Sequence, residues 1–244
     1  MKRFGLIGSP IAHSLSPAMF RATYPEWEYD LIETRDFEEA WQTFRRDYTA
    51  VNVTAPFKLQ AFERADEADT VTRQIGAANI LLNQETGVKA LNTDFWAVCQ
   101  LLRLNMPPLE TPKALVVGCG GAGRAAALAC TNLHLETAVA NRDFDKAERY
   151  CSHAGGMEPL TLEEAGRRLP EFGIVIYTLP LEIPLAGMIR EREEMIALEA
   201  NYLNPCLSGP NYISGKQWLI AQAAAGFRVM TGRIPDWERL NTIL

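Results

Sequence analysis

Three glycines in the segment "VVGCGGAGRAA" restrict the fold of this chain more than any other feature. Gly118, Gly120 and Gly123 have the spacing G-x-G-x-x-G. The apolar run "ALVV" directly before them predicts a buried strand, and the alanine-rich run "RAAALACTNL" directly after them predicts a helix. In that context a bare backbone lets a pyrophosphate approach the first amides of the helix. The segment therefore predicts a dinucleotide-binding βαβ unit, with Gly118, Gly120, Gly121, Ala122 and Gly123 at the phosphates.

The next predicted strand, "TAVAN", ends where such folds distinguish NAD from NADP. An acidic residue there binds the ribose 2′-hydroxyl of NAD, whereas a nearby arginine accommodates the additional phosphate of NADP. Asn141 and Arg142 stand at this place, with Lys146 one helical turn later. Asp143 and Asp145 act in the opposite direction, because a carboxylate repels a phosphate. We therefore expect NADP to be bound by Asn141, Arg142 and Lys146, and NAD remains possible.

Hydrophobic spacing predicts alternating strands and helices in the first 94 residues. Phe37, Trp41 and Phe44 recur on one face of a predicted helix, and Ser16 is expected to cap another helix, with Pro17 at its first position. Strands are expected at residues 3–10, 28–34, 50–56, 77–83 and 87–94, and helices at residues 16–24, 37–46, 59–65 and 66–76. This alternation is typical of an α/β layer.

The second half resumes the alternation after a proline-rich break. Prolines at 107, 108 and 112 predict a linker over residues 105–113, since proline fits neither a helix interior nor a central strand. Strands are then expected at residues 114–117, 137–141, 172–180 and 195–203, and an apolar helix at residues 215–232. The expected fold class is α/β with two domains and the active site in the cleft between them. Residues 1–94 would form a substrate-binding catalytic domain, residues 95–214 a Rossmann-like, doubly wound nucleotide domain, and residues 215–244 a helical segment returning to the first domain.

Composition excludes several classes of protein. The chain is 48% hydrophobic and 22% charged over 244 residues, which is typical of a globular protein. No apolar run approaches the roughly 20 residues of a membrane helix, and the net charge of −6 argues against a general nucleic-acid binder. Five cysteines without a C-x-x-C pair predict reduced thiols and no metal site. Because "MKRFGLIGSPIAHS" also lacks the apolar core of a secretory signal, we expect a cytoplasmic protein.

Seven short motifs resemble those of shikimate dehydrogenases, and they occur in the same order. They are "GSPIAHSLSPAMF", "NVTAPFK", "IGAANIL", "LNTD", "GCGGAGRA", "NR" with "KA" after it, and "GKQWLIAQAA". This resemblance covers nearly the whole chain. It implies an oxidoreductase that reduces 3-dehydroshikimate to shikimate with NADPH, in the biosynthesis of chorismate and aromatic amino acids. It also implies a small-molecule substrate, no nucleic-acid or membrane partner, and a monomer or homodimer.

The same resemblance implies roles for individual residues. Lys58 and Asp94 match the catalytic pair, and a positioned lysine can protonate a ketone oxygen as hydride arrives. Ser14 and Ser16 match the donors to the substrate carboxylate. The other matched residues are Thr54, Asn79, Gln222 and Tyr202 for the substrate, and Thr178 for the cofactor.

The chain also departs from the family pattern. "YTLPLEIP" stands where an Asn-Ala-Thr-Ser-type segment is usual, so only Thr178 carries over. The stretch between Tyr202 and Gln222 is short, and the turn after Tyr202 is one residue longer than usual. Ile80 and Asp143 replace residues that are commonly threonine.

Two other functions stay open at this point. One is a quinate/shikimate dehydrogenase that uses NAD or both cofactors, which Asp143 favours. The other is a non-catalytic dinucleotide-binding sensor. Lys58 and Asp94 argue against the sensor, because neither is needed merely to bind a nucleotide.

Overall fold

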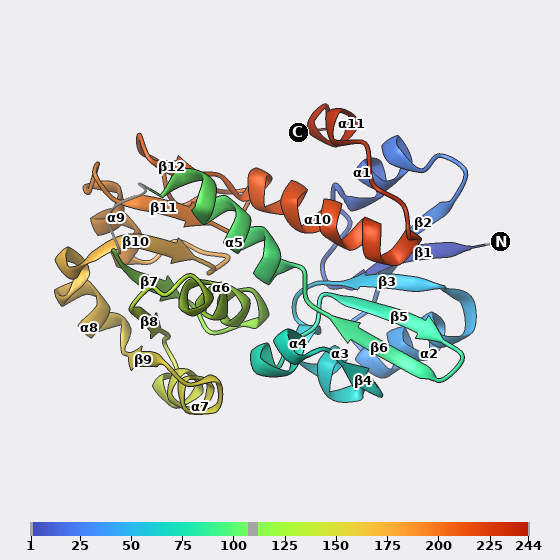
Figure 1. Ribbon diagram of the computed structural model, residues 1–244, viewed down its shortest axis with the longest axis horizontal. Coiled ribbons are helices and arrows are strands. Elements are labelled where there is room, and N and C mark those ends of the chain that lie inside the picture. The colour runs from blue at the N-terminus through green and yellow to red at the C-terminus, as the bar shows by residue number, and fades with distance from the viewer. Residues whose placement is uncertain (1, 107–111, 244) are drawn as a thin grey trace. The chain divides into compact units, whose positions relative to one another are not determined.

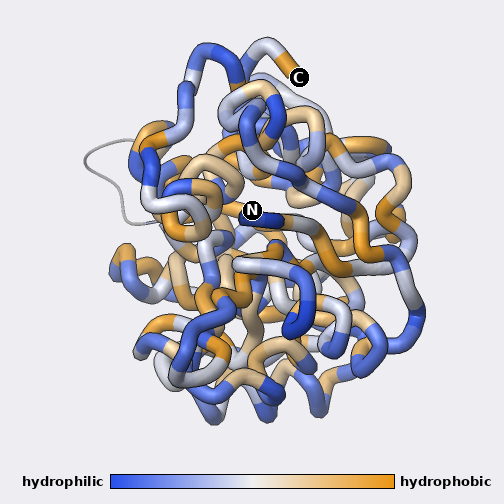
Figure 2. The backbone as a smooth tube through the Cα atoms, turned by 90° about the vertical axis from the view of Figure 1, so that its right-hand side faces the viewer, coloured by the Kyte–Doolittle hydropathy of each residue, from blue (hydrophilic) through white to orange (hydrophobic). Residues whose placement is uncertain are grey.

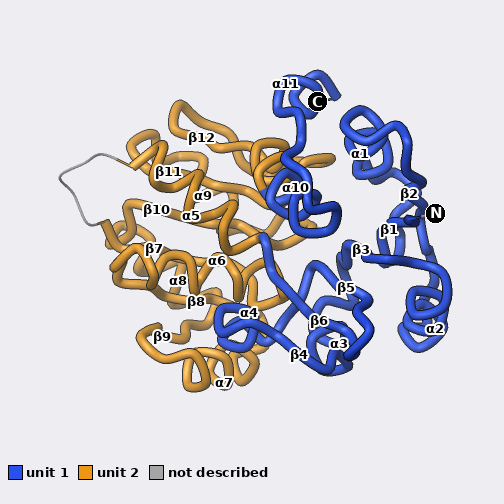
Figure 3. The backbone as a smooth tube through the Cα atoms, turned by 45° about the vertical axis from the view of Figure 1, so that its right-hand side comes forward, with its two compact units in different colours: residues 1–93, 222–244 blue, residues 94–221 orange. Residues whose placement is uncertain are grey.

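The chain forms two compact units, each built on one β-sheet (Figures 1 and 3). The computed structural model describes residues 2–106 and 112–243. Unit 1 combines residues 1–93 with residues 222–244, and unit 2 contains residues 94–221. Helix α10 (Gly215–Thr231) contributes to both units, and the second segment of unit 1 begins within it at residue 222, whereas the predicted C-terminal segment begins at residue 215.

The sheet of unit 1 combines parallel and antiparallel strands. In the described residues its six strands have the order β2-β1-β3-β5-β6-β4. β1 is parallel to β2 and β3, while β5 is antiparallel to β3 and β6. The strands are β1 (Arg3–Gly8), β2 (Glu28–Glu33), β3 (Ala50–Val53), β4 (Glu67–Ala68), β5 (Ile80–Gln84) and β6 (Gly87–Leu91). The trace changes from hydrophilic at the N-terminus to hydrophobic along β1, as expected for a strand between two neighbours (Figure 2).

The helices of unit 1 follow from local sequence signals. Asp36 caps α2, where its carboxylate accepts a hydrogen bond from the Glu38 amide at 2.9 Å. Phe37, Trp41 and Phe44 then lie on the buried face of α2, as their spacing predicts. The helices are α1 (Ser16–Thr23), α2 (Phe37–Asp47), α3 (Lys58–Arg64), α4 (Thr70–Ile75), residues 222–231 of α10, and α11 (Trp237–Asn241).

An aromatic cluster attaches the C-terminal part of α10 to the N-terminal part of unit 1. The Phe227 ring is fully buried and lies edge-on to Phe20, with 5.1 Å between the ring centroids. Tyr24 and Tyr29 lie 6.4 and 6.1 Å from the same ring. Aromatic pairs at these distances contribute beyond the apolar area that they bury. Unit 1 is therefore held together by residues from both ends of the chain.

The sheet of unit 2 is entirely parallel in the described residues, and its six strands have the order β9-β8-β7-β10-β11-β12. Numbered along the chain from β7, this is the order 3-2-1-4-5-6 of doubly wound dinucleotide-binding folds. The strands are β7 (Lys113–Val117), β8 (Thr137–Ala140), β9 (Met157–Leu160), β10 (Phe172–Tyr177), β11 (Ile196–Glu199) and β12 (Tyr212–Ile213). The expected α/β class is confirmed.

Helices connect these parallel strands. α5 packs against α6, and α7 packs against β8 and β9. Alanines at positions 125, 126, 127 and 129 are buried on α6, so small side chains let this helix approach its neighbours closely. The helices are α5 (Asp94–Asn105), α6 (Gly121–Asn132), α7 (Phe144–Ala154), α8 (Leu162–Arg167), the short η1 (Leu169–Glu171), α9 (Pro184–Arg190) and residues 215–221 of α10.

Some sequence predictions of local structure were wrong. Leu15, not Ser16, is the N-cap of α1, because Ser16 is already the first residue of the helix. The helix expected at residues 66–76 begins only at Thr70, since Asp69 caps it and residues 67–68 pair with β6. Short elements such as β9, α8, α9 and α11 were not expected. The predicted linker lies partly within α5 and β7, and its residues 107–111 are outside the described residues.

All five cysteines are buried and unpaired. Burial raises the pKa of Cys99 to about 11 and that of Cys151 to about 11. Burial also raises the pKa values of Cys119, Cys130 and Cys206. No helix in the described residues is long and apolar enough to cross a membrane.

The aromatic cluster predicts a large loss of stability for Phe227→Ala. The substitution removes a buried ring, so the free energy of unfolding should fall by about 3–5 kcal/mol, as measured by urea denaturation. Val229→Ala is the control, because Val229 lies on the same helix and is 41% exposed. Its effect should stay within about 0.5 kcal/mol, and an equally small effect of Phe227→Ala would contradict the role given to the ring.

The buried thiols predict slow reaction with a disulfide reagent. A thiol with a raised pKa stays protonated at pH 8, and the thiolate is the reactive form. The native protein at pH 8 should therefore react slowly with Ellman's reagent. The urea-unfolded chain should release five equivalents of thionitrobenzoate at once, one for each cysteine. Rapid reaction of a thiol in the native protein would show that it is accessible.

Candidate active site

In unit 1 the candidate substrate residues lie at the carboxyl ends of β1 and β3. The order β2-β1-β3 means that the chain leaves β1 toward one side and returns on the other, and open α/β sheets bind ligands at such switch points. The Ser9 amide donates to the carbonyl of Ala55 at 3.2 Å, and the Thr54 amide donates to the carbonyl of Ile7 at 2.9 Å. A Cβ atom at Gly8 would lie 2.4 Å from Cγ2 of Thr54. The two turns therefore touch only because residue 8 is glycine.

The turn after β1 brings the hydroxyls of Ser14 and Ser16 together. The Ser14 hydroxyl donates to the Ser16 hydroxyl at 3.2 Å and accepts from the Ser16 amide at 3.3 Å. Ser16 is 7% exposed, and Ser14 is half-buried. Two adjacent hydroxyls at the start of a helix suit a carboxylate, which accepts hydrogen bonds from both.

The turn after β3 positions Thr54 and Lys58. Phe57 is buried, and its amide donates to the carbonyl of Thr54 at 3.0 Å. Lys58 is the first residue of α3, and its carbonyl accepts from the Ala78 amide at 2.7 Å. The backbone at Lys58 is thus fixed from two sides. The side chains of Thr54 and Lys58 are both half-buried.

A buried polar network joins Asn79 to Gln222. Nδ2 of Asn79 donates to Oε1 of Gln222 at 3.3 Å and to the hydroxyl of Thr93 at 3.0 Å. Oδ1 of Asn79 accepts from the Thr93 amide at 2.8 Å, and the Thr93 hydroxyl donates to the carbonyl of Gln222 at 3.0 Å. The structure therefore brings together two predicted residues from positions 143 apart in the sequence. Thr93 lies inside the "LNTD" motif, and its place in this network was not predicted from the sequence.

A second buried hydrogen bond links side chains of β2 and β3. The Tyr29 hydroxyl donates to Oδ1 of Asn52 at 2.9 Å, and burial raises the pKa of Tyr29 well above its usual value. Nδ2 of Asn52 lies 3.5 Å from the position that a Cβ atom at Gly226 would occupy. The same Cβ atom would lie 2.9 Å from Cδ1 of Ile80, so α10 packs closely against β5 at this glycine.

Asp94 is buried at the start of α5 in unit 2. It is 4% exposed, and its Oδ1 accepts a hydrogen bond from the indole Nε1 of Trp218 at 3.0 Å. The indole fixes the orientation of this carboxylate, a role of Trp218 that was not predicted from the sequence. Lys58 belongs to unit 1 and Asp94 to unit 2, so their pairing stays a prediction.

The backbone of the glycine turn in unit 2 leaves room for the phosphates of a dinucleotide. Gly118 has φ +105°, and a Cβ atom at this residue would lie 2.5 Å from Oγ1 of Thr178. A Cβ atom at Gly123 would lie 2.0 Å from the carbonyl oxygen of Gly118. At Gly120, the N-cap of α6, a Cβ atom would meet nothing within 4 Å. The turn is therefore closed toward the protein and open at the helix start, as a pyrophosphate requires.

Side chains around the turn connect it to the end of β8. Oδ1 of Asn141 accepts from the Cys119 amide at 3.2 Å, and its Nδ2 donates to the carbonyl of Asp143 at 2.9 Å. The carboxylate of Asp143 accepts from the Lys146 amide at 3.2 Å and caps α7. Arg142 is exposed between them. The side chain of Asn141 thus bonds to both the glycine turn and the loop after β8. One carboxylate oxygen of Asp143 caps α7.

The two remaining predicted residues lie at the carboxyl ends of β10 and β11. The hydroxyl of Thr178 donates to the carbonyl of Val117 at 2.9 Å, which places Thr178 beside the glycine turn. Tyr202 follows β11 in a segment held by the fully buried carboxylate of Glu199. That carboxylate accepts from the amides of Cys206 and Leu207, at 2.7 and 3.1 Å. Glu199 was not foreseen, because an acidic residue in an apolar strand gives no functional signal by itself.

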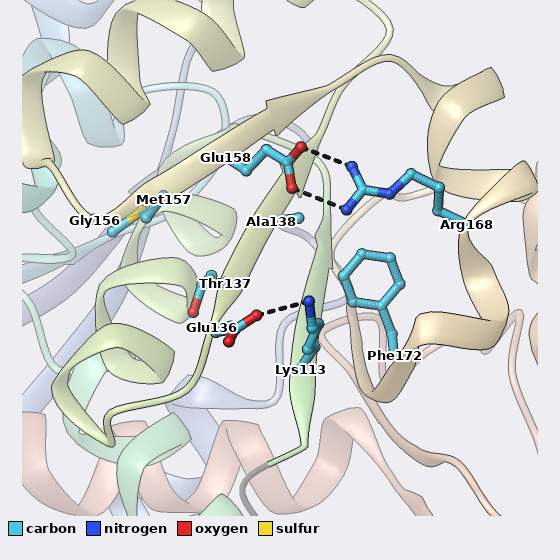
Figure 4. Close-up of a pocket in the computed structure, with 9 residues that line it drawn as sticks. All are labelled: Lys113, Glu136, Thr137, Ala138, Gly156, Met157, Glu158, Arg168 and Phe172. Atoms are coloured by element: carbon cyan, nitrogen blue, oxygen red, sulfur yellow. Dashed lines mark hydrogen bonds and ion pairs between the residues drawn. The ribbon is translucent and has the colours of Figure 1, made fainter.

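A pocket at the opposite end of the same sheet is a separate feature (Figure 4). Its lining includes Lys113 and Glu136, paired at 2.7 Å, and Arg168, paired with Glu158 at 2.7 Å. These charges neutralise one another. The pocket also lies at the amino ends of β7, β8 and β9, whereas ligands of such sheets bind outside the carboxyl ends. It is not the candidate active site.

The chain is similar to known proteins over nearly its whole length. The family model "Shikimate dehydrogenase substrate binding domain" matches residues 6–81. A shikimate dehydrogenase (NADP(+)) from Thermus thermophilus is 32% identical over 256 residues, which cover 97% of this chain and 95% of the relative. One from Bacillus licheniformis is 29% identical over 269 residues, covering 99% and 95%.

A solved structure gives the same result for the fold. The shikimate 5-dehydrogenase of Thermus thermophilus in complex with NADP(H) and shikimate superimposes with a TM-score of 0.83 and 29% identity, over 100% of this chain and 98% of the other. Similarity of this extent, over sequence and fold together, shows that the chain belongs to the shikimate dehydrogenase family.

Proposed function

We propose that this protein reduces 3-dehydroshikimate to shikimate by hydride transfer from NADPH. The observation that carries the proposal is the grouping of Ser14, Ser16, Thr54 and Lys58 on two turns that touch at one end of a sheet. Membership of the shikimate dehydrogenase family supports it, as does the glycine turn of unit 2. A cytoplasmic location and a monomeric or homodimeric state belong to the same proposal.

The donor set suits a polyhydroxylated cyclohexene acid. The hydroxyls of Ser14 and Ser16 bind the substrate carboxylate, and Tyr202 is assigned to the same ligand. Thr54, Asn79 and Gln222 bind the ring hydroxyls, since amides and hydroxyls can both donate and accept. The network of Asn79, Thr93 and Gln222 keeps these amides oriented before the substrate arrives.

Lys58 and Asp94 carry the proton transfer. Bound NADPH supplies a hydride to the carbonyl carbon of the substrate. The ammonium group of Lys58 stabilises the negative charge that develops on the carbonyl oxygen, and it donates the proton that completes the new hydroxyl group. The carboxylate of Asp94 orients the ammonium, and in the reverse direction it helps Lys58 to accept the proton. The indole of Trp218 keeps that carboxylate in place.

NADP has more support than NAD as the cofactor. Arg142 is exposed at the end of β8 with Lys146 one turn further, and both can donate to a 2′-phosphate. The Asp143 carboxylate, which favoured NAD in the sequence analysis, is engaged in capping α7. Oxidation of shikimate, followed at 340 nm with NADP and NAD in parallel, tests substrate and cofactor together. Absence of turnover with both would favour the non-catalytic sensor.

Lys58→Ala should lower kcat by about 10²–10⁴, the usual contribution of a positioned general acid. The fold should be retained, because the side chain is half-buried at the first position of α3. Steady-state kinetics with saturating shikimate and NADP measure the effect. Lys89→Ala, on β6 of the same unit, is the matched control and should leave kcat unchanged.

The same kinetics test the pairing of Lys58 with Asp94. If the two side chains act as one unit, Asp94→Asn should add little to the loss caused by Lys58→Ala. Losses that multiply in the double variant would mean that the two residues act independently.

Arg142→Ala should raise KM for NADP about 10- to 100-fold, since a hydrogen bond to a charged group contributes about 1.5–3 kcal/mol. KM for NAD should change little, because NAD lacks the 2′-phosphate. Arg149→Ala, an exposed arginine later on α7, is the control. Equal changes for both cofactors would remove Arg142 from the phosphate site.

A further inference from the structure

Arg124 has a half-buried guanidinium that no described acid neutralises. It is the fourth residue of α6, directly after the glycine turn. Its Nε atom is buried, its side chain hydrogen-bonds the Cys119 thiol, and Arg124 forms no ion pair with any described residue. A thiol is a weak acceptor, so the guanidinium keeps its capacity for a stronger, anionic one.

Tyr150 holds the guanidinium of Arg124 in place. The guanidinium carbon lies 5.1 Å from the ring centroid, within the range of a cation–π contact. The Tyr150 hydroxyl donates to the carbonyl of Arg124 at 2.7 Å, and Tyr150 is 2% exposed. Because Tyr150 belongs to α7, these contacts direct Arg124 toward the helix that follows β8. They also reduce the conformational freedom that the side chain would lose on binding a ligand.

Other positive groups share this region. The Cys119 thiol donates to the carbonyl of Lys146 at 3.6 Å. Burial raises the pKa of this thiol, and the nearby positive charges of Arg124 and Lys146 partly offset the rise. Arg142 stands at the start of the same loop. The carboxylate of Asp143 is turned to the Lys146 amide instead of to a cation. The cations Arg124, Arg142 and Lys146 thus lie around the carboxyl end of β8, and in the described residues none of them is ion-paired with Asp143 or Asp145.

We infer that Arg124 is a specificity-determining residue that binds the 2′-phosphate of NADP, together with Arg142 and Lys146. This inference rests on the proposed function for the presence of NADP. The 2′-phosphate is the better candidate than the pyrophosphate for two reasons. The open amides at Gly120 serve the pyrophosphate, and Arg124 faces α7, beyond the strand end where the adenosine ribose binds.

Calorimetric binding of two nucleotides to the full chain tests this role without turnover. Adenosine 2′,5′-bisphosphate carries the 2′-phosphate, and 5′-AMP lacks it. Arg124→Met keeps a long apolar side chain against Tyr150 but removes the charge. It should weaken binding of the bisphosphate about 10- to 100-fold, and binding of 5′-AMP by less than about twofold.

A second variant keeps the test valid if Arg124→Met folds poorly. Arg124→Lys retains the charge without the planar fork, so it should weaken only the bisphosphate, and by less than Arg124→Met. Thermal melting without ligand serves as the control for folding.

Equal weakening of both nucleotides, or of neither, would overturn the inference, as would a failure of the wild-type protein to bind the bisphosphate. Failure of the proposed function gives a different result. In that case shikimate oxidation is absent with both cofactors, while discrimination between the two nucleotides and its dependence on Arg124 persist.

Discussion

The arrangement of unit 2 depends on a steric limit at one glycine. A Cβ atom at Gly123 would lie 2.0 Å from the carbonyl oxygen of Gly118, so any other residue would force α6 away from β7. The contact lets the chain reverse direction over a few residues and start a helix at the end of a buried strand. The amides at the start of α6 and the side chains of Asn141 and Arg124 all take their positions from this turn. A single absent methyl group thus decides where a phosphate-bearing ligand can lie.

Unit 1 positions its candidate residues mainly through hydrogen bonds. Its candidate residues come from four separate stretches of the chain, and backbone hydrogen bonds between neighbouring turns bring them together. Hydrogen bonds among Asn79, Thr93 and Gln222 fix the orientation of the two side-chain amides before a ligand binds. The hydroxyls of Ser14 and Ser16 are likewise held side by side by the hydrogen bond between them.

The sequence predicted the main strands and helices because their signals are local. The spacing of Phe37, Trp41 and Phe44, and the strand–glycine–helix order around Gly120, depend only on nearby residues. The N-cap of α1 was misplaced because Ser16 has the residue type of an N-cap, whereas the helix already begins at Ser16 and Leu15 precedes it without a side-chain cap. Trp218, Thr93, Glu199 and Arg124 were missed for another reason. Trp218 and Thr93 bond to residues distant in sequence, Arg124 contacts a ring on the next helix, and Glu199 bonds to amides of the loop after its own strand. None of these contacts leaves a trace in a linear pattern.

The position of Phe227 has a consequence for how the protein matures during synthesis. A nascent chain that has emerged only to residue 221 contains every residue of unit 2, yet the first 93 residues still lack the ring that Phe20, Tyr24 and Tyr29 surround. Domains generally fold as units as they leave the ribosome. The part that is translated first is therefore completed only after residue 227 has been synthesised, later than every residue of unit 2.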